Sequence, residues 1–299
     1  MVPIAYLGLV VIWSTVPLAI KWSLDGPQYL FGVSARFAIA ALVLLAALRL
    51  TGRPWPRHAT ALKVYALATL NFYSFIGSYY AALRIPSGWI GVTWGAAPLL
   101  TAVLAAWWLG ERSLTPRKVS GLLLGLAGFV VMFGTAAEFG PGAVLGLAAN
   151  LTTVAVSTAS TVWIKRIGAH IPALATTASG VTGAALAYGL TWALFDGTVP
   201  ERFDPRMAHA IVYAALAGTA VVYMCFYYVL RHVSATRIAL ASMVTPALAL
   251  YVGHVGDGEP IGPRVWIGTA MIMLALVLHE MVPRRAPARM AEPDLPRTD

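Results

Sequence analysis

The sequence predicts an all-α integral membrane protein, with ten transmembrane helices arranged as two inverted five-helix repeats around a central cavity. Composition, a series of apolar stretches and an internal repeat predict this fold. Hydrophobic residues make up 59% of the chain and charged residues 11%, with a mean hydropathy of +0.74. A soluble domain carries about 25% charged residues. Because this chain cannot cover its outside with charge, its surface must face lipid.

Ten apolar stretches, each about as long as a bilayer span requires, follow one another with short connections. The longest connection, 196–207, has turn chemistry and no room for a soluble domain. The first stretch lacks a basic leader, so no cleavable signal peptide is expected. Residues 283–299 are Pro-rich and charged and are predicted to be a disordered tail. The expected spans are 3–24, 27–50, 59–83, 86–109, 115–134, 142–165, 171–195, 207–230, 234–255 and 261–282.

Polar, Pro and Gly positions recur 147 or 148 residues apart. Apolar residues could coincide by chance in such a chain, but matched Arg, Pro, Glu and Gly at fixed spacing indicate one unit written twice. We therefore expect a first repeat at 1–134 and a second at 142–282. The matched positions are Leu83 with Leu230, Arg84 with Arg231, Ser87 with Ser234, Pro98 with Pro246, Glu111 with Glu259, Pro116 with Pro263 and Gly121 with Gly268.

The basic residues predict the orientation. With the N-terminus in the cytoplasm, fifteen Lys and Arg residues fall on the inside and five on the outside, so both termini are predicted to be cytoplasmic. Five spans are an odd number, so the second repeat must enter the membrane from the opposite side. Inverted repeats are typical of secondary transporters, which bind substrate near the midplane between the halves.

Several function classes are disfavoured by composition. The net charge is +9, but the basic residues lie in the short connections between spans, where they set membrane topology. Nucleic acid is therefore a poor candidate partner. Cys225 is the single cysteine, which rules out an internal disulfide or a Cys-based metal cluster, and the six His are not spaced as ligand pairs. No metal or cofactor is expected, and an enzyme is not favoured. No Asp or Glu lies in the middle of a span, which favours a facilitator or exchanger over an ion-coupled pump.

Two basic residues lie in or beside unusual segments. Arg36 is deep in the second span, where a charge is costly and usually functional; we expect it to face the cavity as a counter-charge or gate, the alternative being an outward-reaching side chain. Pro17 interrupts the first span, and Ser14 and Thr15 can satisfy the freed backbone. Such a break often marks a substrate path. For Lys21, which follows it, an interfacial position is the better interpretation.

Polar and aromatic residues inside the spans predict a cavity lining. Asn71, Ser74 and Ser78 share one helix face, and Asn150 and Ser157 belong to a polar stripe in the sixth span. Polar faces avoid lipid, so they point inward. There they either line a cavity or form interhelical hydrogen bonds, each worth about 0.6 kcal/mol. The residues expected to line the cavity are Trp13, Ser14, Arg36, Asn71, Tyr73, Ser78, Trp94, Asn150, Ser157, Trp163, Tyr223 and Ser242.

Small residues form stripes on two spans. Gly121, Gly125 and Gly128 lie on one stripe of the fifth span, and Gly142 and Gly146 on the sixth. Such stripes allow close helix contact, within one chain or between two copies. Packing within the chain is favoured, and a monomer or a homodimer is expected.

Three short motifs stand in the two halves: Arg36-Phe37, Pro98 with Leu109-Gly110-Glu111, and Pro246 with Glu259. With these motifs the chain resembles the drug/metabolite transporter superfamily, in its EamA-type branch. The resemblance covers about residues 3–282 and rests on two five-span halves and a few short motifs. The second copy departs from the pattern, because it has Asp257-Gly258-Glu259 where the first has Leu109-Gly110-Glu111. The resemblance implies an inner-membrane transporter, commonly an exporter of amino acids or related metabolites, with a cavity lined mainly by spans one to four and six to nine.

The expected function is transport of small metabolites across a bacterial inner membrane by alternating access, most favourably export of amino acids, including aromatic ones. An aromatic cavity with amide, hydroxyl and cationic donors suits them, and Arg36 can meet a carboxylate. The expected partners are the small-molecule substrate and the lipid bilayer. Efflux of drugs or organic cations is disfavoured, because such sites generally use a membrane-embedded acid. A lipid-modifying enzyme would need clustered acids at a span mouth, and the acidic loop 196–205 is more simply solvated.

Overall fold

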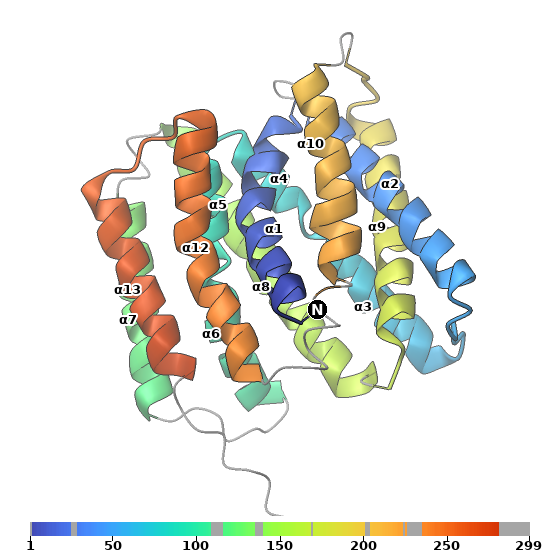
Figure 1. The fold of residues 1–299 in the computed structure, drawn as a ribbon, viewed down its shortest axis with the longest axis horizontal. Coiled ribbons are helices and arrows are strands. Elements are labelled where there is room, and N and C mark those ends of the chain that lie inside the picture. Colours follow the sequence, from blue (N-terminus) through green and yellow to red (C-terminus); the bar gives the residue numbers. More distant parts are fainter. Residues whose placement is uncertain are drawn as a thin grey trace, which may run out of the picture.

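A computed structural model describes residues 2–24, 29–108, 116–134, 140–168, 170–200, 204–223, 225 and 235–280. Every regular element in these ranges is helical, and the helices lie side by side in one bundle (Figure 1). The elements are α1 (Val2–Trp22), α2 (Tyr29–Leu50), α3 (Ala59–Tyr73), α4 (Ile76–Ala82), α5 (Ser87–Thr93), α6 (Ala96–Trp108), α7 (Pro116–Phe133), α8 (Pro141–Gly168), α9 (Ala173–Phe195), α10 (Pro205–Ala215), the π-helix η2 (Leu216–Val221), α12 (Ala235–Asp257) and α13 (Pro263–Glu280).

Length and apolarity make these helices membrane spans. Within the described residues, five segments are long and apolar enough to cross a bilayer, and a shorter apolar helix covers Pro263–Leu278. The all-helical membrane fold expected from composition is therefore confirmed. The five segments are Pro3–Trp22, Tyr29–Leu50, Ser87–Trp108, Gly142–Gly168 and Ala173–Phe195.

The third and fourth predicted spans are each divided into two helices, which the apolar pattern alone does not reveal. In the fourth, the break between α5 and α6 lies at Trp94. Pro98 has no N–H to donate to the Trp94 carbonyl, and Ala97 N–H donates to it instead, at 3.0 Å. In the third, the carbonyl of Ser74, at the break between α3 and α4, accepts from the Thr153 hydroxyl at 2.6 Å. Interrupted helices therefore meet α8 in the middle of the bundle.

Glycines bring α7 and α13 into close contact at one edge of the bundle (Figure 1). A Cβ built on Gly128 would lie 2.8 Å from the carbonyl oxygen of Gly268, and one built on Gly268 would lie 2.6 Å from that of Gly128. Gly146 of α8 similarly meets Ala81 and Arg84 at the end of α4. At these glycines, the small-residue stripes serve packing within the chain, as favoured from the sequence.

Candidate functional site

Arg36 of α2 is buried in the bundle, with 2% of its surface exposed. Its Nε donates to the Thr219 hydroxyl at 3.2 Å, one terminal nitrogen donates to the Gly218 carbonyl at 3.3 Å, and the other to the Tyr79 hydroxyl at 3.5 Å. Each of these three partners is neutral. The side chain therefore does not reach outward to the surface, and its hydrogen bonds within the described residues hold the guanidinium cation inside the bundle through neutral dipoles.

Two of the Arg36 partners belong to the π-helix η2. The Thr219 hydroxyl donates to the Ala214 carbonyl, five residues earlier, at 3.0 Å, and single π-turns are frequent at functional sites. Gly218 also permits a close approach by α1, because a Cβ there would lie 2.7 Å from a methyl group of Val16. Arg36 thus binds the segment where α1, α2 and the eighth span meet.

Two aromatic rings lie close to the Arg36 guanidinium. Its central carbon lies 5.3 Å from the Phe37 ring centroid and 5.9 Å from that of Phe75, within the range of cation–π attraction. Phe75 in turn stacks on Trp94, with the ring centroids 5.2 Å apart. The cation and a continuous aromatic surface therefore lie next to each other.

A cluster of charges joins the ends of three helices. Lys21 Nζ lies 2.8 Å from carboxylate oxygens of both Asp257 and Glu259. Glu259, 5% exposed, also accepts from the backbone N–H groups of Ser87 at 2.6 Å and Gly88 at 3.0 Å. A carboxylate is favoured there because the first N–H groups of α5 lack helical partners and carry the positive end of the helix dipole. The cluster connects α1, α5 and the end of α12.

Asp257 extends this cluster to α10. It accepts from Trp22 Nε1 and from Arg206, each at 3.1 Å, and the Arg206 guanidinium lies 4.0 Å from the Trp22 ring centroid. Burial alone would raise the pKa of Asp257, but hydrogen bonds from Lys21 and Trp22 and the charges of Lys21 and Arg206 outweigh it and lower the pKa below its usual value. In the sequence, Asp257-Gly258-Glu259 was a departure from the repeat; in the structure, both of its acids are partners of Lys21.

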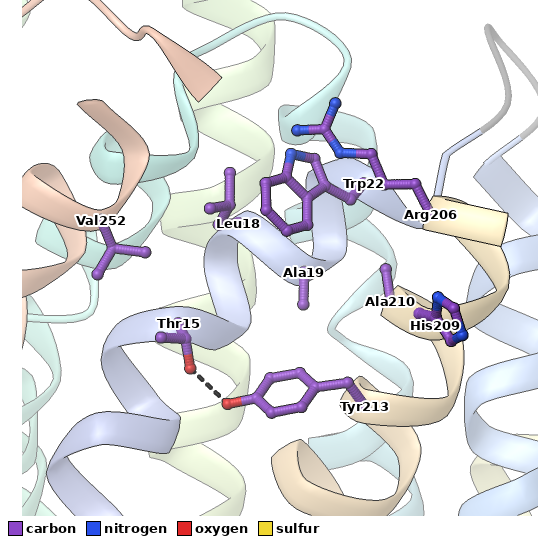
Figure 2. A pocket seen from close by; sticks show the side chains of 9 residues that line it. All are labelled: Thr15, Leu18, Ala19, Trp22, Arg206, His209, Ala210, Tyr213 and Val252. Carbon is purple, nitrogen blue, oxygen red and sulfur yellow. Dashed lines mark hydrogen bonds between the residues drawn. The ribbon is translucent and has the colours of Figure 1, made fainter. Parts of the chain in front are cut away.

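A cavity of about 720 Å³ lies between α1, α10 and α12, a volume typical of small-molecule sites. Figure 2 shows Thr15 and Tyr213 reaching towards each other from α1 and α10, and their hydroxyls are 2.5 Å apart. Trp22 and Arg206 lie together at another part of the lining (Figure 2). The lining residues are Thr15, Leu18, Ala19, Trp22, Arg206, His209, Ala210, Tyr213 and Val252.

The sequence did not identify this cavity. Of the predicted site residues whose side chains the structure describes, none lines it. Ser14 precedes Thr15 but donates to the Val10 carbonyl of its own helix at 2.7 Å. Two residues in the sequence could have pointed to this cavity, namely Thr15 in the broken first span and Tyr213 in the eighth. Their contact could not be predicted, because it depends on how two helices that are distant in sequence pack together.

The predicted polar faces of the third and sixth spans come together. Ser78 donates to the side-chain oxygen of Asn150 at 2.7 Å, and Ser157 donates to that of Asn71 at 2.5 Å. The Asn150 amide nitrogen donates to the Ile90 carbonyl at 3.3 Å and to the Thr93 hydroxyl. These bonds join α3, α4, α5 and α8, as the interhelical interpretation requires; substrate contact by these residues stays a prediction.

The remaining predicted residues are dispersed. The Tyr73 hydroxyl lies 2.7 Å from that of Thr191, and Trp163 is 41% exposed on the outside of the bundle. Trp13 is half-buried in α1, and Tyr223 packs edge-on against the Phe72 ring. Ser242 lies in α12, but its side chain is outside the described residues.

A bundle of apolar, membrane-spanning helices with a buried cation and a cavity between helices defines a multi-pass membrane protein. The chain belongs to the EamA-like transporter family, whose model matches residues 2–134 and again 143–280. It is 24% identical over 286 residues to the S-adenosylmethionine/S-adenosylhomocysteine transporter of Chlamydia trachomatis serovar L2, covering 90% of this chain and 86% of that one. It is 32% identical over 151 residues to the aromatic amino acid exporter YddG of Ancylobacter novellus, covering 44% and 48%. A crystal structure at 23% identity has the same fold, with a TM-score of 0.64 and coverage of 93% and 95%.

Proposed function

We propose that this transporter moves small metabolites, most favourably amino acids including aromatic ones, outward or in exchange across the bacterial inner membrane. The observation that carries the proposal is the buried Arg36, whose hydrogen-bond partners in the described part of the chain are all neutral. A charge at membrane depth is costly unless it is paired. A substrate carboxylate supplies the missing counter-charge and can accept two parallel guanidinium bonds.

The surroundings of Arg36 favour substrates that carry an aromatic or apolar group. Phe75 and Trp94 stack beside the guanidinium, so a ring can pack against them while its carboxylate meets Arg36. The relatives named for aromatic amino acids and for S-adenosylmethionine support the same substrate class. Efflux of organic cations that lack a carboxylate is the weaker candidate, because such a cation offers Arg36 no counter-charge.

The two-fold match to the family model supports the inverted-repeat arrangement. In this arrangement both termini are cytoplasmic, and substrate crosses by alternating access between the two halves. The protein works as a monomer or homodimer in this proposal. Export or exchange is favoured over ion-coupled uptake, since the sequence places no carboxylate in the middle of a span.

Solute counterflow tests the proposal. Proteoliposomes are loaded with a mixture of unlabelled amino acids, and each labelled amino acid is offered outside in turn. The wild type should accumulate a subset, and Arg36→Ala should reduce this at least tenfold, because the carboxylate loses its partner. Arg49→Ala, at the exposed end of the same helix, is the matched control and should retain activity.

Amino-acid amides separate a binding role from a structural one. If Arg36 binds the carboxylate, Arg36→Ala should lower transport of acids much more than transport of the corresponding amides. An equal loss for both would show that Arg36 only holds η2 in place. Absence of counterflow for every amino acid in the wild type would reject the substrate class.

A further inference from the structure

We propose that the cavity between α1, α10 and α12 is a second substrate site on the transport path, one that takes the ring of an aromatic zwitterion. The inference rests on the proposed function and extends it, because it assigns a binding role to residues distant from Arg36. Three features carry it: the walls of the cavity, the charges beside it, and its position relative to Arg36.

The walls are mostly apolar and aromatic. Apolar side chains come from all three helices, namely Leu18 and Ala19 of α1, Ala210 of α10 and Val252 of α12 (Figure 2). The Trp22 and Tyr213 side chains add two aromatic surfaces (Figure 2). Pockets with apolar walls and few polar groups favour ligands that bury a ring or a large alkyl group. A small polar amino acid gains little from such walls.

Charges of both signs lie beside the cavity and are partly exposed. Arg206 lines it with a side chain that is 51% exposed, and Asp257, bonded to both Arg206 and Trp22, is 22% exposed. A zwitterion presents a carboxylate and an ammonium group close together, which match the Arg206 guanidinium and the Asp257 carboxylate. With Lys21 and Glu259, the local formal charge is zero, because two cations face two anions. This balance favours a zwitterion over a net anion or cation.

The cavity lies next to the segment that holds Arg36. The Thr15–Tyr213 hydrogen bond joins α1 to α10 at the cavity lining, and the next residue of α1, Val16, contacts Gly218. The Gly218 carbonyl accepts from Arg36. The contact between α1 and the eighth span therefore separates the two sites, and opening it would connect them. A substrate released from Arg36 can then place its ring in the cavity.

Filling the cavity tests this site. Ala210→Trp places a large ring in the lining, whereas Val212→Trp adds the same bulk at a position of the same helix that is 43% exposed. In exchange assays, Ala210→Trp should lower transport of phenylalanine or tryptophan at least tenfold and that of alanine less than twofold, and Val212→Trp should leave both unchanged. Equal loss of aromatic substrates and alanine, or no loss, would overturn the proposal.

A labelling experiment keeps the proposal testable if Ala210→Trp does not fold. Replacing the single cysteine by Cys225→Ser gives a background for Val252→Cys in the cavity lining. Phenylalanine should slow the reaction of this thiol with a small methanethiosulfonate reagent at least threefold, and alanine should not; no protection by phenylalanine contradicts the second site. If the wild type exchanges no amino acid, the proposed function fails as well. If it exchanges them in an Arg36-dependent way without protection at Val252→Cys, the second site alone fails.

Discussion

α1 and α8 open the two halves of the chain, and each packs beside the helices of a matching span. The interface of α8 with α3 and α4 (the α8 seam) is closely packed, because a Cβ built on Gly77 would lie 2.4 Å from the Ala149 carbonyl oxygen. The hydrogen bond from Ser78 to Asn150 crosses this interface. The interface of α1 with α10 (the α1 seam) contains the cavity, and the hydrogen bond between the Thr15 and Tyr213 hydroxyls crosses it. The α8 seam and the α1 seam occupy matching places in the two repeats. One is closely packed and the other contains a cavity, so the two repeats pack differently in this structure.

This difference is what alternating access requires of a repeated fold. If the two halves exchange packings, the α1–α10 seam must close as the α3/α4–α8 seam opens. Interhelical hydrogen bonds in membranes are worth only about 0.6 kcal/mol on average, so a hydrogen-bonded seam can open at modest cost. The polar face of α8 therefore suits a contact that forms and breaks in the proposed transport cycle.

Locking the α1 seam should have the largest effect. Val16→Cys with Gly218→Cys, in the Cys225→Ser background, places two thiols where a methyl of Val16 already lies 2.7 Å from a Cβ built at position 218, a spacing compatible with a disulfide. Oxidation should abolish counterflow and reduction should restore it, because α1 and η2 can no longer separate. The single-cysteine variants should be insensitive to oxidant. Full activity of the cross-linked double variant would show that this contact stays closed throughout the cycle.

Loosening the other seam should have an intermediate effect. Asn150→Ala removes the bonds to Ser78, Ile90 and Thr93 at a fully buried position, and should lower the free energy of unfolding by about 2 kcal/mol, taking about 0.6 kcal/mol for each bond. Denaturant unfolding in mixed micelles measures this loss. Thr152→Ala, on an exposed position of the same helix, is the control and should change stability by less than about 0.5 kcal/mol. A similar loss in both variants would mean that the α8 polar face contributes no special stability.

Removing the bond across the α1 seam should have the smallest effect on stability. Tyr213→Phe deletes the partner of the Thr15 hydroxyl and keeps the ring in the cavity lining. We expect a loss of about 0.6 kcal/mol, and a change in the initial rate of counterflow of no more than about threefold, since this energy corresponds to a factor of that size. Thr15→Val should behave alike, and the double variant should add no further loss. Additive losses would show that the two hydroxyls act independently.

The sequence predicted those features that depend on composition and spacing. The membrane fold, the repeat and the burial of Arg36 follow from apolar length, matched polar positions and the cost of a charge in lipid. The Arg36 partners do not follow, because the π-turn at Thr219 has no pattern that distinguishes it from an α-helix. The cavity was missed because its lining alternates with ordinary packing residues on α1 and α10. Asn71 and Ser157 were placed on inward faces, but their pairing depends on the relative height of two helices.

The lowered pKa of Asp257 determines how the protein responds to acid on one side of the membrane. A carboxyl whose pKa is lowered by folding stabilises the fold fully above its unfolded pKa, and this contribution is lost only as pH falls through the folded value. Folding lowers the pKa of Asp257 below its ordinary value, so this carboxyl is harder to protonate in the folded protein than in the unfolded chain. With the termini cytoplasmic, as proposed, this group faces the outside, where pH varies most. The contacts of Asp257 to Lys21, Trp22 and Arg206 then persist when the medium turns mildly acidic, so external acid alone does not release α1, α10 and α12 from one another at this end.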